Sequence, residues 1–199
     1  MLDLGANIEC DSGNLVQFAV MGQIFARLVL NLKRPTVGLL NVGSEEQKGH
    51  EELREASAIL RQIDLPMEFI GFVEGDDITA GTVDVIVTDG FSGNIALKAA
   101  EGTSRMFTFF LKEAFGSSIY SKIGYVLSKT AINQVRERMD PRKYNGAVFL
   151  GLNGVVVKSH GGTDSFGFAN AIGVAYDMAK YNFIEDLKKK LSITTKHLI

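Results

Sequence analysis

The stretch VIVTDGFSGNIALKAAEG, residues 85–102, decides the fold that we expect for this chain. It opens with a continuous apolar run that has the length and the β-branched composition of a buried strand. Two glycines among polar residues follow, and a segment with helical apolar spacing comes next. A buried strand that leads directly into a helix is the repeating unit of a parallel sheet covered by helices.

The same order recurs along the chain. Before residue 115, strands are predicted in four runs, MLDLGAN, TVGLLNVG, MEFIGFV and VDVIVTDG, with helices or short helical loops after each of them. Further on, AVFLGLNGVVVKSHGG predicts two short strands, or one strand with a glycine bend. This alternation predicts an α/β fold, with a mostly parallel sheet and helices on both faces. We expect residues 1–199 to form a single α/β domain with a helical protrusion at about 115–140.

Two helix boundaries carry specific predictions. Ser44 and Gln47 match a capping box for the helix after TVGLLNVG, although Gly49 interrupts its first turn and favours a start near His50. Residues 164–191 are predicted to form one closing helix, with Asp164 or Ser165 as its N-cap.

Composition excludes several classes of protein. The chain has 199 residues, is 46% hydrophobic and carries a net charge of −2, so it can bury a sizeable core and lacks the basic excess of nucleic-acid binders. Its one cysteine, Cys10, excludes an internal disulfide framework. There is no apolar run of about 18 or more residues and no signal-peptide pattern. We therefore expect a cytoplasmic protein.

Three predicted strands end in glycine with polar neighbours, in the segments DLGAN, NVGSEEQKG and TDGFSGN. Ligands of parallel sheets bind beyond the carboxyl ends of the strands, so these loops are expected to meet at one crevice. In the third loop Asp89, Gly90, Gly93 and Asn94 precede a helix, whose free N–H groups suit an anion or a carbonyl oxygen that gains charge. The alternative is a plain strand-to-helix turn with Asn or Ser as the N-cap.

The second loop places Lys48 after Gly43 and Ser44, where an ammonium group can serve as a point charge for phosphate. The alternative is a solvated lysine paired with Glu52. His160, beside two glycines, is a candidate proton carrier or phosphate contact, or else a structural residue of a glycine turn. No metal-ligand spacing occurs, so we expect neither a metal site nor a cofactor.

Residues 117–138 predict an amphipathic helix. Lys122, Lys129 and Arg136 recur at every seventh position beside an apolar side. Such a helix can pack on the body of the protein or on a dimer partner. It can also lie in a membrane interface, or present its cations to an acidic protein.

Several long motifs together resemble one family. LDLGAN, LVQFAVMG, VGLLNVGSEEQKG, DVIVTDGFSGNIALKAAEG and YNGAVFLGLNGVVVKSHG occur in the order found in the bacterial acyl-carrier-protein:phosphate acyltransferases, known as PlsX. The resemblance extends from Leu2 to about Leu191. It implies a fold like those of phosphotransacetylase and isocitrate dehydrogenase, with an added helical tip.

The resemblance also implies a function. Members of the family transfer a long-chain acyl group from acyl carrier protein to inorganic phosphate, and the acyl phosphate feeds the membrane glycerol-3-phosphate acyltransferase of phospholipid synthesis. They are homodimers, cytosolic or peripherally bound to the membrane. The family's catalytic lysine corresponds to Lys48 and its catalytic asparagine to Asn94. Its membrane-touching tip corresponds to the region around 115–138, where Tyr125 accompanies the three cations.

Family members carry a substantial region before LDLGAN, so the resemblance implies an N-terminally truncated chain of doubtful activity. Two other functions stay open. One is a phosphate acetyl- or butyryltransferase that uses coenzyme A. The other is an inactive dimerising or membrane-docking fragment.

Overall fold

A parallel three-stranded sheet lies at the centre of the structure, a computed structural model that describes residues 1–195. Its strands are β1 (Thr36–Leu40), β2 (Glu68–Val73) and β3 (Val85–Val87). They lie side by side in the order β2-β1-β3. Leu2 extends the sheet beyond β3 through an isolated parallel bridge to Val87. The predicted α/β class with a parallel sheet is confirmed. The strand expected in MLDLGAN is reduced to this bridge, because Asp3 already starts a loop.

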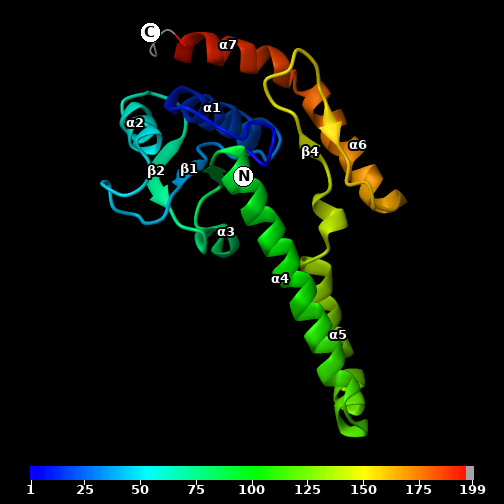
Figure 1. The fold of residues 1–199 in the computed structure, drawn as a ribbon. Coiled ribbons are helices and arrows are strands. Elements are labelled where there is room, and N and C mark those ends of the chain that lie inside the picture. The colour runs from blue at the N-terminus through cyan, green and yellow to red at the C-terminus, as the bar shows by residue number, and fades with distance from the viewer. Residues whose placement is uncertain (196–199) are drawn as a thin grey trace.

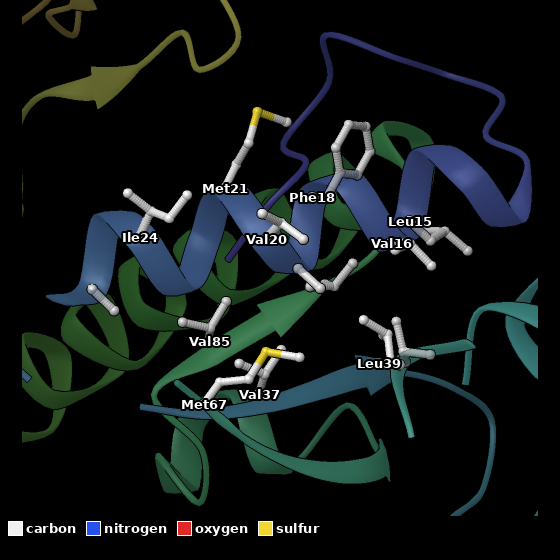
Figure 2. Close-up of a cluster of buried hydrophobic side chains, with 14 of the residues drawn as sticks. Leu15, Val16, Phe18, Val20, Met21, Ile24, Val37, Leu39, Met67 and Val85 are labelled. Atoms are coloured by element: carbon white, nitrogen blue, oxygen red, sulfur yellow. The ribbon is translucent and has the colours of Figure 1, made fainter. Parts of the chain in front are cut away.

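Two helices, α1 (Ser12–Leu28) and α2 (Glu51–Leu60), pack together beside the strands, and Figure 1 draws the short α3 (Asp77–Ala80) on the other side. Val37 and Leu39 of β1 and Val85 of β3 lie on one side of α1, and Phe18 and Met21 point to its other side (Figure 2); all of these residues are buried. Gly22 makes the close approach possible, since a Cβ there would lie 2.6 Å from Cγ1 of Val85. This contact between α1 and the sheet forms the centre of the core.

The start of α2 decides between the two predictions made for it. The helix begins at Glu51 with His50 as its N-cap, as Gly49 favoured. The capping box of Ser44 and Gln47 is wrong, because residues 41–50 form a loop before the helix. Gly49 has φ +87°, in the left-handed region, which a helix cannot continue through.

Helices α4 (Gly90–Gly116) and α5 (Ile119–Arg138) form a hairpin that projects away from the sheet (Figure 1). Within Ile119–Arg138 no residue is buried, and within α4 only Gly90 and Gly93 are. The idea that α5 packs on the body of the protein is therefore wrong. Large apolar side chains face solvent along both arms, among them Met106, Phe107, Phe109, Phe110, Ile119, Ile123, Val126, Leu127 and Val135.

The chain returns from the hairpin through η1 (Pro141–Tyr144) to the antiparallel pair β4 (Ala147–Val148) and β5 (Val157–Lys158), and closes with α6 (Ser165–Lys180) and α7 (Phe183–Thr195). The prediction of one closing helix is wrong. Asn182 adopts φ 51°, which ends α6 and turns the chain so that α7 packs on α1. Phe183 is fully buried there, edge-on to Phe25 with ring centroids 6.2 Å apart. No helix within residues 1–195 is long and apolar enough to span a membrane.

Candidate active site at the sheet edge

Three loops leave the carboxyl edge of the sheet side by side. β1 and β3 are direct neighbours, with Leu39 opposite Val87, and the bridge at Leu2 adjoins β3. The segments that follow, the loops 3–7 and 41–50 and the start of α4 after residues 88–89, therefore begin at adjacent positions on one edge. The strand order thus places the three strand ends next to one another, as predicted, whereas a shared crevice between their loops stays a prediction.

The first loop is organised by the buried carboxylate of Asp3. It accepts hydrogen bonds from the backbone N–H groups of Gly5 (2.9 Å), Ala6 (3.0 Å) and Asn7 (2.6 Å), and from the Asn7 side chain (2.9 Å). Burial favours the protonated acid, but these four donors outweigh it and hold the pKa of Asp3 below its ordinary value. The carboxylate thus folds residues 3–7 into a compact turn.

This turn lies against the start of α4. The Gly90 N–H donates to the carbonyl oxygen of Asn7 at 2.7 Å, and a Cβ on Gly90 would lie 2.5 Å from that same oxygen. A Cβ on Gly93 would collide with the carbonyl oxygen of Asp3. Both glycines of TDGFSGN are therefore required by the close approach of residues 3–7.

Asp89 is the N-cap of α4, in place of the Asn or Ser expected for a plain turn. Its Oδ1 accepts from the Ser92 N–H at 2.7 Å, and its carbonyl oxygen accepts from the Gly93 N–H at 3.0 Å. With the Gly90 N–H bound to Asn7, three of the first four amides of the helix have acceptors within the chain. Fewer backbone donors remain for an anion than the sequence pattern indicated.

Asn94 lies in the second turn of α4 rather than before the helix, because α4 begins at Gly90. Its Nδ2 donates to the carbonyl oxygen of Leu4 at 3.0 Å, which fixes the orientation of the amide. A side-chain amide nitrogen carries two hydrogens, so one N–H remains for a second acceptor. Asn94 is partly exposed.

Lys48 pairs with Glu45 rather than with Glu52. Its Nζ lies 2.8 Å from Oε2 of Glu45, and about half of each side chain is exposed. The hydrogen bond between them raises the pKa of Lys48 and lowers that of Glu45. The pair lies over Gly43, where a Cβ would come 2.8 Å from Nζ, whereas Ser44 is exposed beside it. Lys48 is thus a charged group, open to solvent, in the loop that follows β1.

His160 belongs to a different part of the molecule, between β5 and α6. It lines a shallow hollow of about 470 Å³ with Ser159, Thr163, Asp164 and Phe168. Its Nδ1 accepts from the Gly162 N–H at 3.1 Å, which leaves Nε2 as the donor of the neutral ring. Within residues 1–195 no hydrogen bond or ion pair joins His160 to Lys48 or Asn94.

The candidate contact residues of α5, Lys122, Lys129 and Arg136, are exposed on the hairpin. The Tyr125 ring packs edge-on against Phe115 of α4, with centroids 5.4 Å apart. Tyr125 therefore helps to hold the two arms together. The sheet edge and these cations are separate parts of the fold (Figure 1).

Sequence reasoning missed the residues that hold the loops in shape. Asp3 and Asn7 organise the first loop, and Asn41 and Arg54 bind the backbone of the second. A polar residue directly after a buried strand is the signal that could have identified Asp3 and Asn41. Among the described residues, no group of three or more His, Cys, Asp or Glu side chains could hold a metal ion.

This geometry defines a class of α/β protein in which a lysine-bearing loop and an asparagine-bearing helix follow neighbouring strands of a parallel sheet. The family model described as "Fatty acid synthesis protein" matches residues 1–186, and the chain belongs to that family. The resemblance found in its motifs is thereby confirmed.

Curated relatives agree with this assignment. The "Phosphate acyltransferase" of Rhodospirillum centenum is 64% identical over 192 residues, covering 96% of this chain and 54% of the relative. That of Paramagnetospirillum magneticum is 60% identical over 190 residues, with the same two shares. That of Agrobacterium fabrum is 57% identical over 194 residues, covering 97% and 55%. The chain spans about half the length of the curated relatives it matches.

Proposed function

We propose that this chain provides the lysine and asparagine of a phosphate acyltransferase, which transfers a long-chain acyl group from acyl carrier protein to inorganic phosphate in phospholipid synthesis. The proposal rests on one observation above all. The Lys48 loop and the helix that carries Asn94 follow β1 and β3, which are paired neighbours in a parallel sheet. The printed names of the relatives supply the reaction class.

The chemistry needs little from the protein beyond positioning and charge. A phosphate oxygen attacks the thioester carbonyl carbon, the C–S bond breaks, and the products are an acyl phosphate and the carrier thiol. A thioester is already activated, so no covalent enzyme intermediate is required. Lys48 holds the phosphate dianion, and the second N–H of Asn94 donates to the carbonyl oxygen as it gains negative charge.

The other candidate residues take supporting roles in this proposal. Gly43 lets the side chains of Lys48 and Glu45 pass close over the backbone, and the exposed Ser44 follows it. Asp89, Gly90 and Gly93 set the start of α4 against residues 3–7. His160 is the exception, since it lies in a separate part of the fold, between β5 and α6, and is given no role in this proposal. No metal or cofactor takes part.

The test measures acyl phosphate, trapped as its hydroxamate, from acyl carrier protein thioester and phosphate. Asn94→Ala removes one oxyanion donor and is expected to lower kcat roughly 10²- to 10³-fold with an unchanged fold. Lys48→Ala is expected to raise KM for phosphate. The same substitutions are made at the aligned positions of the full-length Rhodospirillum centenum relative. Low activity in this chain but not in the relative would then be due to the part of the protein that this chain does not contain. Near-normal turnover of both Asn94 variants would contradict the assignment.

A coenzyme A thioester of acetate or butyrate is the second candidate donor, since the chemistry at the carbonyl is identical. Competing acyl carrier protein against coenzyme A thioesters of equal chain length separates the two. A preference for the coenzyme A donor would reassign the substrate and leave the roles of Lys48 and Asn94 intact.

The α4–α5 hairpin supports a proposal about partners. Its apolar side chains are exposed, and Lys122, Lys129 and Arg136 accompany them on α5. We infer a contact surface for a second copy in a homodimer and for an anionic membrane, near the glycerol-3-phosphate acyltransferase that consumes the product. Charge reversal of the three cations is expected to reduce co-sedimentation with anionic vesicles. Retained binding after charge reversal would rule out the electrostatic contact.

A further inference from the structure

The loop from Asn41 to His50 is closed by one buried side chain. Asn41 follows β1 directly and is only 8% exposed. Its Oδ1 accepts from the Val42 N–H at 2.9 Å, and its Nδ2 donates to the carbonyl oxygen of Lys48 at 3.1 Å. Its own N–H continues the sheet by donating to Val73 at 2.8 Å. A single amide group, anchored to the sheet, therefore joins the two ends of the loop.

The rest of the loop is built around this amide. Gly49 passes so close to it that a Cβ at that position would collide with Oδ1 of Asn41. From α2, Nη1 of Arg54 donates to the carbonyl oxygens of Gln47 at 3.3 Å and Gly49 at 3.0 Å. The backbone on both sides of Lys48 is thus fixed by side chains of the sheet edge and of α2.

This arrangement determines where the ammonium group lies. The Lys48 N–H donates to the carbonyl oxygen of Glu45 at 3.0 Å, and its side chain folds back over Gly43. A lysine side chain is long and flexible, and about half of this one is exposed, so the exposed ion pair with Glu45 confines it weakly. The fixed backbone at residue 48 gives the side chain one starting point, from which it extends over Gly43.

We propose that Asn41 is a positioning residue of the phosphate site, because it holds the Lys48 loop at the carboxyl end of β1. The inference rests on the proposed role of Lys48 as the phosphate-binding cation. Asn41 does not touch the phosphate in this proposal. It acts through the carbonyl group of Lys48, and its effect exists only while residue 48 is a lysine.

A double-mutant cycle tests this dependence, with inorganic phosphate as the probe and its Kd measured by titration calorimetry on the 199-residue chain. Asn41→Ala is expected to weaken phosphate binding about tenfold, and Lys48→Ala by at least as much. In the Lys48→Ala background, Asn41→Ala is expected to change Kd less than twofold. Asn41→Asp keeps an acceptor for Val42 but loses the donor to Lys48, so it is expected to be as weak as Asn41→Ala.

A stability control separates positioning from general damage. Asp84 accepts two hydrogen bonds from Thr36, at 2.8 and 2.9 Å, at the opposite end of β1. Asp84→Ala is expected to lower the Tm and leave the phosphate Kd unchanged.

Each failure has its own pattern. If Lys48→Ala binds phosphate as the wild type does, or if neither this chain nor the full-length Rhodospirillum centenum relative binds phosphate, the proposed function of Lys48 is wrong and the inference falls with it. If Lys48→Ala binds weakly but Asn41→Ala weakens binding equally in both backgrounds, Lys48 keeps its role and the positioning role of Asn41 is wrong. Rescue by Asn41→Asp would also overturn it.

Discussion

Replacing Gly93 by alanine tests the close packing of residues 3–7 on α4. A Cβ at position 93 would collide with the Asp3 carbonyl oxygen and lie 2.8 Å from Cγ2 of Thr88. The first obstacle is backbone, which cannot turn aside as a flexible side chain can. Gly102 lies in the same helix, and a Cβ there would meet nothing within 4 Å. Gly102→Ala is therefore the matched control.

The two substitutions are expected to act with opposite signs. Overpacking at Gly93 costs about 1–3 kcal/mol, and displacing residues 3–7 forfeits the Asn94–Leu4 hydrogen bond, worth about 1 kcal/mol. Alanine's higher helix propensity returns up to about 1 kcal/mol, so the net loss is about 2 kcal/mol. Gly102→Ala keeps only the propensity term and should gain about 0.5–1 kcal/mol.

Urea and thermal unfolding measure the difference. For a chain of this size, a change of 1 kcal/mol corresponds to about 2–4 °C, so Gly93→Ala should unfold roughly 4–8 °C lower and Gly102→Ala about 1–4 °C higher. Hydrogen exchange should localise the damage, since the Thr88 N–H, bound to the Leu2 carbonyl oxygen at 2.8 Å, loses protection when residues 3–7 shift. Equal stability of the two variants would refute the packing described here.

Three further predictions concern single groups. Glu45→Gln should tighten phosphate binding about two- to fivefold, because it frees Lys48 from its ion pair. Glu46→Gln is the control, since it removes only the exposed pair with Arg61 and should leave phosphate binding unchanged. Weaker binding in Glu45→Gln would show that Glu45 helps to hold the anion. Asp3→Ala should cost roughly 3 kcal/mol in urea unfolding, since it leaves three backbone donors without their acceptor. Because the folded-state pKa of Asp3 is lowered, its stabilisation should be present at neutral pH and be lost as the pH falls through that value. If the wild type and the Asp3→Ala variant lose stability in parallel in acid, this role of Asp3 is contradicted. Hydrogen bonds from Arg142 lower the pKa of Asp140 to about 2, so its carboxyl carbon should titrate near that value by NMR and return toward the ordinary value in Arg142→Met; an unchanged midpoint would exclude Arg142 as the cause.

Much of the fold could be predicted from local patterns. The apolar runs at residues 36–40 and 85–87 have the length and β-branched composition of buried strands, and both are strands of the sheet. The break at Asn182 could not be predicted this way. Residues 164–191 keep helical spacing throughout, and the left-handed turn is set by the burial of Phe183 against Phe25, a contact remote in sequence.

The candidate site likewise combines residues that local sequence patterns reveal with contacts that they do not. Lys48 and Asn94 could be singled out because each follows a predicted strand, but their partners could not. Glu45 replaces the expected Glu52 because residues 44–49 do not form a helix, so the spacing of four residues loses its meaning. Leu4 reaches Asn94 across 90 positions of sequence, through a backbone carbonyl group that no residue type reveals.

The unbroken course of α4 makes the hairpin a lever. The helix has 27 residues, about 40 Å at 1.5 Å per residue, and Asn94 lies near its base while the turn to α5 lies at its far end. Gly90 and Gly93, wedged under the carbonyl groups of residues 3–7, form the fulcrum. A tilt of about 5° at that point moves the far end by about 3.5 Å, on the same straight-rod geometry. Conversely, a partner that binds the far end of the hairpin exerts a torque on the packing of Gly90 and Gly93 against residues 3–7. A small rotation at that point is enough to change the direction of the Asn94 amide.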